Sequence, residues 1–204
     1  NVTAKTTKEV ILLSRWEAAS LYEKEFTKLI QSLSLHDCSK KIKKVVGKTW
    51  EPYRVFLRPI RNKLNQTQKE IESCLKENRE PKKTLLVQSV NEIIQPLNDV
   101  YNSLSSVKCQ IIANGIVLDL IRRAHTFGLN LTKLDIRQEA ARHYKLITSV
   151  CKKLGIADYS KLSEEAKIKF LSKEYKSKRP LIPQNIKLDA DDNETWTTFK
   201  MISE

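Results

Sequence analysis

Glycine, proline and methionine are scarce in this sequence: four Gly, six Pro and one Met occur among 204 residues. This scarcity argues against collagen-like and low-complexity chains, which depend on Gly and Pro. Hydrophobic residues make up 40% of the chain and charged residues 30%, so there is enough apolar material for a buried core. We therefore expect one or two folded domains.

Long hydrophobic runs are also lacking. The longest, IIANGIVLDLI, is interrupted by Asn114, Gly115 and Asp119 and falls short of the roughly 18 residues that cross a membrane. The first residues, NVTAKTTKEV, do not form a signal peptide. The chain begins with Asn and not with Met, which favours processing or, more strongly, excision from a longer chain. We expect a cytoplasmic protein with no membrane partner.

Acidic residues are a minority, with 24 Asp and Glu against 37 Lys and Arg, and the net charge is +13. A basic chain can bind nucleic acid, anionic membranes or acidic metabolites. Here the positive residues are mostly lysines scattered along helical stretches, without an Arg-rich tract or an aromatic ladder. A solvated lysine surface is the favoured interpretation, and no nucleic-acid partner is expected.

Cysteine and histidine are too few and too widely spaced for a familiar metal site. No two cysteines have the CxxC spacing of zinc or redox motifs. We expect four reduced thiols in a cytoplasmic protein and no metal site from these residues. The residues concerned are Cys38, Cys74, Cys109, Cys151, His36, His125 and His143.

Apolar residues recur at helical spacing through most of the chain. The first predicted helix covers residues 6–34, with an apolar stripe that includes Val10, Leu13, Leu29 and Leu33. Further helices are predicted from Pro52 to about residue 75, over 85–105, over 107–126, from Gln138 to about 154, and from Ser163 to before the SKRPLIP stretch.

Proline, glycine and serine mark where these helices begin, bend and end. Pro52 suits the first position of a helix, whereas Pro59, inside the same pattern, should kink or split it. Pro96 is another candidate for a kink. Gly128 and Gly155 are predicted to follow helix ends, and Ser163 should cap a helix whose first turn is acidic.

One short stretch has the period of a strand. In LNLTKLDIRQ, Leu134 and Ile136 share one face, and Lys133, Asp135 and Arg137 share the other. A second strand is predicted in WTTFKMISE, near Met201, after a loop over 184–195. Two strands alone do not make a stable sheet, so they either pair outside this chain or are minor decoration.

Arg137 follows this predicted strand and precedes a helix. In α/β barrels, active-site groups occupy the same position. A guanidinium there could bind phosphate or carboxylate, helped by the amides of the helix N-terminus. The alternative is a buried ion pair with Asp135 that has no chemical function. Sequence spacing leaves both interpretations open.

The stretch LTKLDIRQEAARH resembles the LDIRQES-x-RH signature of phosphoenolpyruvate carboxylase. Four other segments resemble that family in the same order, and together they span nearly the whole chain. They are SRWEAASLYEKE, EPYRVFLRPIRNKL, IIANGIVLDLIRRAHTFGLNL and GIADYSKLSEEAKIKFLSKEYKSKRPLIP.

The resemblance implies a mainly α fold: a helical fragment of a (β/α)8-barrel enzyme with many added helices and one or two short barrel strands. Residues 1–204 would be a single incomplete central segment, with a helical part over about 6–126 and a barrel strand and following helices over about 129–204. The family forms homotetramers and uses Mg²⁺ or Mn²⁺, with ligands outside this segment, and no biotin.

The resemblance also implies the chemistry. Bicarbonate attacks the phosphoryl group of phosphoenolpyruvate, giving carboxyphosphate and the pyruvate enolate. Carboxyphosphate yields phosphate and carbon dioxide, which the enolate captures to form oxaloacetate. Arg137 matches the signature arginine that is thought to hold the phosphate and carboxyphosphate oxygens. The segment alone is expected to be inactive.

Other residues match the family with less specific implications. Arg54 matches the arginine of the PYR helix, near a sugar-phosphate activator site in plant members; a surface or ion-paired arginine is the favoured alternative. The supporting candidates around the signature are Asp135, Gln138, Arg142 and His143, of which Arg142 and His143 are expected to be mainly structural.

The sequence departs from the family at three places. Ala140 stands where the signature has serine, which removes one hydroxyl group near the site. Pro59 is unusual in the PYR helix, and residues 36–49 diverge locally. Two alternative functions stay open: a stand-alone helical module that binds anions or proteins, and a basic helical nucleic-acid binder.

Overall fold

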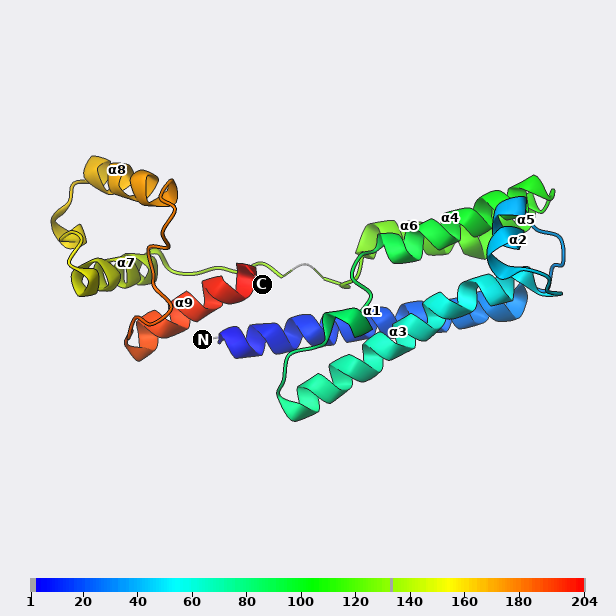
Figure 1. Ribbon diagram of the computed structural model, residues 1–204, viewed down its shortest axis with the longest axis horizontal. Coiled ribbons are helices and arrows are strands. Elements are labelled where there is room, and N and C mark those ends of the chain that lie inside the picture. The colour runs from blue at the N-terminus through cyan, green and yellow to red at the C-terminus, as the bar shows by residue number, and fades with distance from the viewer. Residues whose placement is uncertain (1–2, 133, 204) are drawn as a thin grey trace. The chain divides into compact units, whose positions relative to one another are not determined.

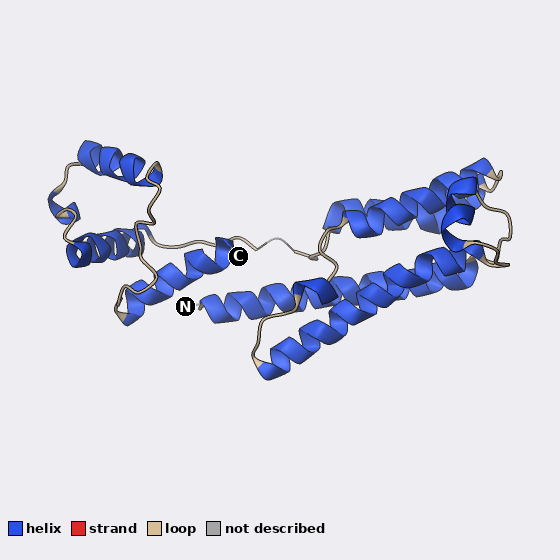
Figure 2. Cartoon of the chain, viewed as in Figure 1, coloured by secondary structure: helices blue, strands red, loops and turns tan. Residues whose placement is uncertain are grey.

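The computed structural model describes residues 3–132 and 134–203, and all regular structure within them is helical (Figure 2). The chain divides into two compact units. The larger unit comprises residues 9–134, and the smaller unit comprises residues from 135 onward together with the N-terminal residues up to Lys8. The prediction of a mainly α fold is confirmed.

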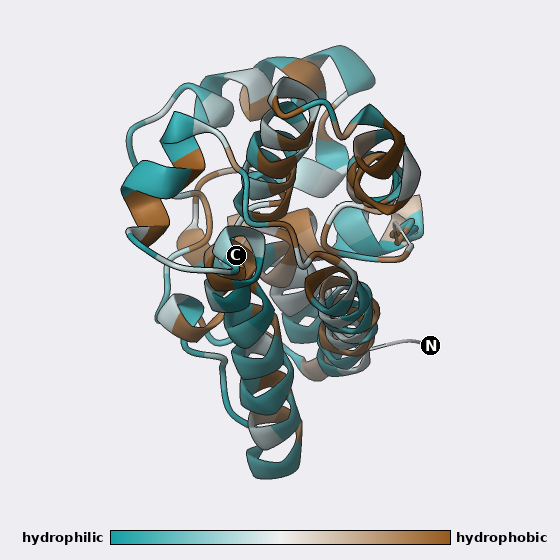
Figure 3. Ribbon diagram, turned by 90° about the vertical axis from the view of Figure 1, so that its right-hand side faces the viewer, coloured by the Kyte–Doolittle hydropathy of each residue, from teal (hydrophilic) through white to brown (hydrophobic). Residues whose placement is uncertain are grey.

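Long helices form the larger unit (Figure 1). Helix α4 packs against α6, and the short helix α2 packs against both α3 and α4. Each helix carries apolar and polar residues along its length (Figure 3). The elements are α1 (Ala4–Ser32), α2 (Lys40–Val46), α3 (Pro52–Glu77), η1 (Lys83–Leu85), α4 (Asn91–Ser106), α5 (Gln110–Ile112), η2 (Ala113–Val117) and α6 (Leu118–Phe127).

The core of the larger unit is one continuous cluster of apolar side chains from these helices. Its largest fully buried members are Tyr53, Phe26, Leu29, Leu33, Ile42, Leu57, Leu64, Ile93, Leu97, Leu104 and Leu120. The stripe predicted for α1 is buried only in its C-terminal half: Leu29 and Leu33 are buried, whereas Val10 and Leu13 are exposed.

The smaller unit contains α7 (Ala140–Leu154), η3 (Tyr159–Lys161), α8 (Glu164–Tyr175) and α9 (Ala190–Ser203). Helices α7 and α9 pack together. The small core of this unit includes Leu146 and Val150 from α7 and Ile182 from the connection before α9, with Trp196 packed against it. The backbone N–H of Ala4 also donates to the carboxylate of Glu194 over 2.8 Å. Its core cluster has far fewer buried residues than that of the larger unit.

Several predicted helix boundaries are confirmed. Pro52 begins α3. Gly128 follows α6 at φ 61° and Gly155 follows α7 at φ 62°, the left-handed region that favours glycine. The hydroxyl of Ser163 accepts a hydrogen bond from the backbone N–H of Ala166 over 3.3 Å, which caps α8.

The strand predicted over about 129–138 is wrong for the described residues. Residues 134–138 carry no strand assignment and make no backbone hydrogen bond to another described residue. Apolar and charged residues do alternate here, but a strand needs a second strand to pair with, and the described residues contain no such strand. Lys133, part of this prediction, lies outside the described residues.

The loop predicted over 184–195 is confirmed only up to Asp189, and the strand near Met201 is wrong, because helix α9 begins at Ala190 and covers the rest. The side chain of Asp189 accepts a hydrogen bond from the backbone N–H of Asp192 over 2.9 Å. Asp191 and Asp192 place negative charge in the first turn, where it interacts favourably with the helix dipole and stabilises the helix. The β-branched and aromatic residues of WTTF gave the misleading strand signal.

Three interior helix predictions need correction. Helix α3 continues through Pro59, so the predicted split is wrong, whereas the alternative of a kink stays a prediction. Helix α4 begins at Asn91 and not at Leu85, because the carboxylate of Glu92 accepts hydrogen bonds from the N–H groups of Gln88 and Ser89. The single helix predicted over 107–126 is interrupted by the π-helical turn η2, where Gly115 has φ −84° and ψ −120°.

None of the helices in the described part of the chain is both long enough and apolar enough to span a membrane.

Candidate functional site

Arg137 lies in the segment without regular secondary structure that precedes α7. Its Nε donates to the Oδ2 of Asp135 over 2.8 Å, so the predicted pairing of these residues is present. The pair is not buried, because the side chains of Arg137 and Asp135 are 89% and 73% exposed. An exposed pair contributes only about 0–1 kcal/mol to stability. Asp135 therefore orients the guanidinium more than it stabilises the fold.

The terminal nitrogens of Arg137 are available to a ligand. Neither has a hydrogen-bond partner among the described residues. Because Nε donates to Asp135, the two terminal nitrogens remain as donors. Together they suit two oxygens of a phosphate or a carboxylate. The arrangement can therefore bind an anion.

The residues between Arg137 and α7 prepare the start of that helix. The side-chain oxygen of Gln138 accepts a hydrogen bond from the N–H of Glu139 over 3.2 Å. Glu139 is extended, with φ −67° and ψ 133°, and its carbonyl accepts from the N–H of Arg142 over 3.0 Å. Arg137 therefore stands three residues before Ala140, the first helical residue, where N–H groups favour anions.

His143 contacts α9 and not Arg137. Its ring centroid is 4.9 Å from that of Phe199, with the planes at 53°. Two residues further on, the ammonium of Lys145 lies 3.1 Å from the carboxylate of Asp191, and this hydrogen bond raises the pKa of Lys145. No hydrogen bond links Arg142 or His143 to Arg137 among the described residues. The sequence around Phe199 predicts a strand, so it does not indicate this contact between two helices.

Arg54 is occupied by contacts with the end of α1. Its Nε donates to the carbonyl of Leu33 over 3.0 Å, and one terminal nitrogen donates to the carbonyl of Gln31 over 3.0 Å. The other terminal nitrogen pairs with Glu51. These contacts favour a structural function, the capping of helix carbonyls. Its assignment to an activator site stays a prediction.

No metal is assigned to this chain. In the ranges that the structure describes, no group of three His, Cys, Asp or Glu residues lies close enough to hold an ion. The residues present here do not fit the Mg²⁺ or Mn²⁺ of the predicted enzyme, and no chemical step on these residues is routed through a metal.

Comparison with known proteins gives consistent matches over the whole chain. The family model described as phosphoenolpyruvate carboxylase matches residues 1–204. Phosphoenolpyruvate carboxylases of Psychromonas ingrahamii and Photorhabdus laumondii are each 40% identical to the chain, over 204 and 206 residues. That of Hahella chejuensis is 39% identical over 203 residues.

Each of these matches covers 100% of this chain but only 23–24% of the relative. The chain thus spans about a quarter of the length of the proteins it resembles. Because the family model covers every residue, the matching signature around Arg137 is one part of a continuous similarity. The chain belongs to the phosphoenolpyruvate carboxylase family.

Proposed function

We propose that this chain is part of an enzyme that carboxylates phosphoenolpyruvate with bicarbonate, giving oxaloacetate and phosphate. The observation that carries the proposal is the exposed guanidinium of Arg137, held by Asp135 within a stretch that resembles the family signature. The family membership of the whole chain supports it. The stand-alone helical module is less favoured, because no part of the chain lies outside the family match.

Arg137 would act on the anionic species of this reaction. Phosphoenolpyruvate, bicarbonate, carboxyphosphate and phosphate are all negatively charged. A cation fixed before reaction stabilises charge as it develops, with no need for solvent to reorganise. Asp135 holds one edge of the guanidinium, and the remaining edges are free to take two oxygens of the transferring group.

The rest of the enzyme belongs to the same proposal. It includes Mg²⁺ or Mn²⁺, which would supply electrophilic stabilisation of the anions, with ligands elsewhere in the protein. It also includes a homotetramer and a cytoplasmic location. The 204-residue chain alone should lack carboxylase activity, because a single anion-binding arginine is not a complete active site.

The test is carboxylase activity of the full-length protein with Arg137→Lys and Arg137→Ala. Lysine keeps the charge but loses the planar fork. We expect Arg137→Ala to lose at least ~3 kcal/mol of transition-state stabilisation, about a hundredfold in rate. Arg137→Lys should also show a large fall.

The matched control is Arg122→Lys, because Arg122 is another exposed arginine, 68% accessible and 3.6 Å from the carboxylate of Asp119. It should retain the full rate. Equal rates for wild type and both Arg137 variants, with normal folding, would reject the catalytic assignment and leave Arg137 as a structural residue.

A further inference from the structure

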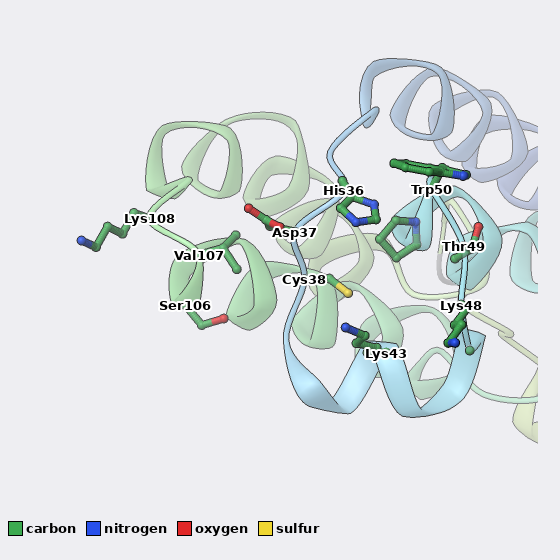
Figure 4. A pocket seen from close by; sticks show the side chains of 12 residues that line it. His36, Asp37, Cys38, Lys43, Lys48, Thr49, Trp50, Ser106, Val107 and Lys108 are labelled. Carbon is green, nitrogen blue, oxygen red and sulfur yellow. The ribbon is translucent and has the colours of Figure 1, made fainter.

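A second feature of the larger unit is a pocket of about 830 Å³ between the α1–α3 connection and the turn that follows α4 (Figure 4). This volume lies within the range of small-molecule sites, about 300–1,000 Å³. Its residues come from two segments far apart in sequence, 36–52 and 106–108. Neither segment takes part in the proposed carboxylase chemistry of Arg137.

One end of the pocket is aromatic. The rings of His36 and Trp50 lie 5.1 Å apart, inclined at 35°. Trp50 is nevertheless 82% exposed, so most of its indole surface is open to solvent. Exposing so large an apolar ring is unfavourable in water, and a flat ligand that covers it would remove that cost.

The other end of the pocket is cationic. Figure 4 shows the ammonium groups of Lys43 and Lys48 at the end opposite Trp50. Neither lysine has an ion-pair partner among the described residues, whereas nearby Lys41 lies 2.5 Å from the carboxylate of Asp99.

Two further charges line the pocket. Asp37 is acidic and opposes an anion, and Lys108 on the facing turn offsets its charge. In Figure 4 the ammonium of Lys108 points away from Lys43 and Lys48, so it contributes to the potential more than to direct contact. With three lysines against one aspartate, the pocket favours negative ligands.

The frame of the pocket is fixed by buried contacts. The hydroxyl of Ser103 lies 2.9 Å from that of Tyr53 and accepts a hydrogen bond from the N–H of Ser39 over 2.8 Å. Ser39 in turn caps α2, and Ile42 in that helix is fully buried. These contacts join both pocket segments to the core and set the direction in which Lys43 projects.

We propose that this pocket binds a small anion that carries a planar ring, a nucleoside phosphate or a compound of the same chemistry. The ring would stack on Trp50, and the phosphate oxygens would meet Lys43 and Lys48. The inference does not depend on the proposed carboxylation.

The test uses adenosine 5′-diphosphate as the probe, titrated into the full-length protein by calorimetry. Adenosine and inorganic pyrophosphate supply the ring and the charge separately. The diphosphate should bind at least about tenfold more tightly than either part, a difference of about 1.4 kcal/mol. Its affinity should fall as salt is added. No binding of the diphosphate, or equal binding by pyrophosphate, overturns the proposal.

Variants locate the binding. Lys43→Glu with Lys48→Glu should weaken it by more than about tenfold, and Trp50→Ala by about tenfold. The matched control is Lys40→Glu with Lys44→Glu, which makes the same change of charge on exposed residues that do not line the pocket. Equal loss in both lysine pairs, or full affinity in Trp50→Ala, places the probe elsewhere and rejects the pocket.

Discussion

Arg79, which lies just beyond the end of α3, forms an ion pair with Glu70 inside that helix, with 2.6 Å between its Nη1 and the Oε1 of Glu70. The backbone N–H of Lys82 donates to the same oxygen over 2.8 Å. Asn78 between them has φ 52° and ends the helix in the left-handed conformation. Glu70 thus ties the loop after α3 back onto its last turns. The hydrogen bonds from Arg79 and Lys82 lower the pKa of Glu70 from 4.5 to about 2.

This ion pair predicts a loss of stability in acid. The pKa of Glu70 is lower in the folded chain than in the unfolded chain, so its contribution is present above about pH 4.5 and is lost as the pH falls towards 2. Glu70→Gln should lower the unfolding temperature at pH 7 and reduce the difference between pH 7 and pH 3. Thermal unfolding of the 204-residue chain, followed by circular dichroism, measures both.

The control for Glu70 is Glu17→Gln, on the exposed face of α1. It should leave the pH dependence of unfolding as in the wild type. If Glu70→Gln behaves like Glu17→Gln, the Glu70 carboxylate does not hold the loop in solution.

Arg54 should matter for stability. Replacing it with Ala leaves the carbonyls of Gln31 and Leu33 without the guanidinium, and each unsatisfied group costs about 1–3 kcal/mol where water cannot replace the donor. We expect Arg54→Ala to lower the free energy of unfolding by about 1–3 kcal/mol in urea titrations. Arg58→Ala, one turn later on the exposed face of α3, should change it little. An equal effect of the two variants would contradict the capping function.

Pro59 should be a site where the fold can be stabilised. It lies exposed inside α3, where it cannot donate a backbone hydrogen bond. Pro59→Ala restores that donor, but it also makes the unfolded chain more flexible, which offsets part of the gain. We expect a net stabilisation of about 1–3 kcal/mol. Pro52→Ala, at the first turn, should give no such gain. The measurement is the unfolding temperature of each variant relative to the wild type. A lower unfolding temperature for Pro59→Ala than for the wild type would show that the proline is needed for packing.

The contact between His143 and Phe199 should couple α7 to α9. A double-mutant cycle with His143→Ala and Phe199→Ala isolates the ring contact from other losses. We expect a coupling free energy of about 0.5–1.5 kcal/mol, the usual range for a tilted aromatic pair. Strictly additive effects of the two substitutions on unfolding would mean that the rings touch without stabilising the helix pair.

Local signals predicted much of this fold. Pro52, Gly128, Gly155 and Ser163 mark helix boundaries through backbone geometry and capping, which depend on a few neighbouring residues. The pairing of Asp135 with Arg137 was also predictable, because residues two apart in an extended segment share a face.

Features that depend on distant residues were missed. The pocket at Trp50 forms because Ser39 and Ser103 meet across 64 residues of sequence. The β-branched and aromatic residues of α9 favour a strand, and the hydrogen bond to Asp189 at the start of the helix is a weaker sequence signal. The strand before Arg137 could not be settled by its own pattern, since a strand exists only with a neighbour.

That unpaired segment has a consequence for solubility. Residues 134–138 have no regular secondary structure, and Leu134 and Ile136 are exposed at alternate positions, a pattern that invites strands of other molecules to add. Asp135 and Arg137 interrupt the apolar residues with charge, which is one way natural edges resist such addition. The guanidinium proposed for anion chemistry would then also hinder the aggregation of this exposed segment.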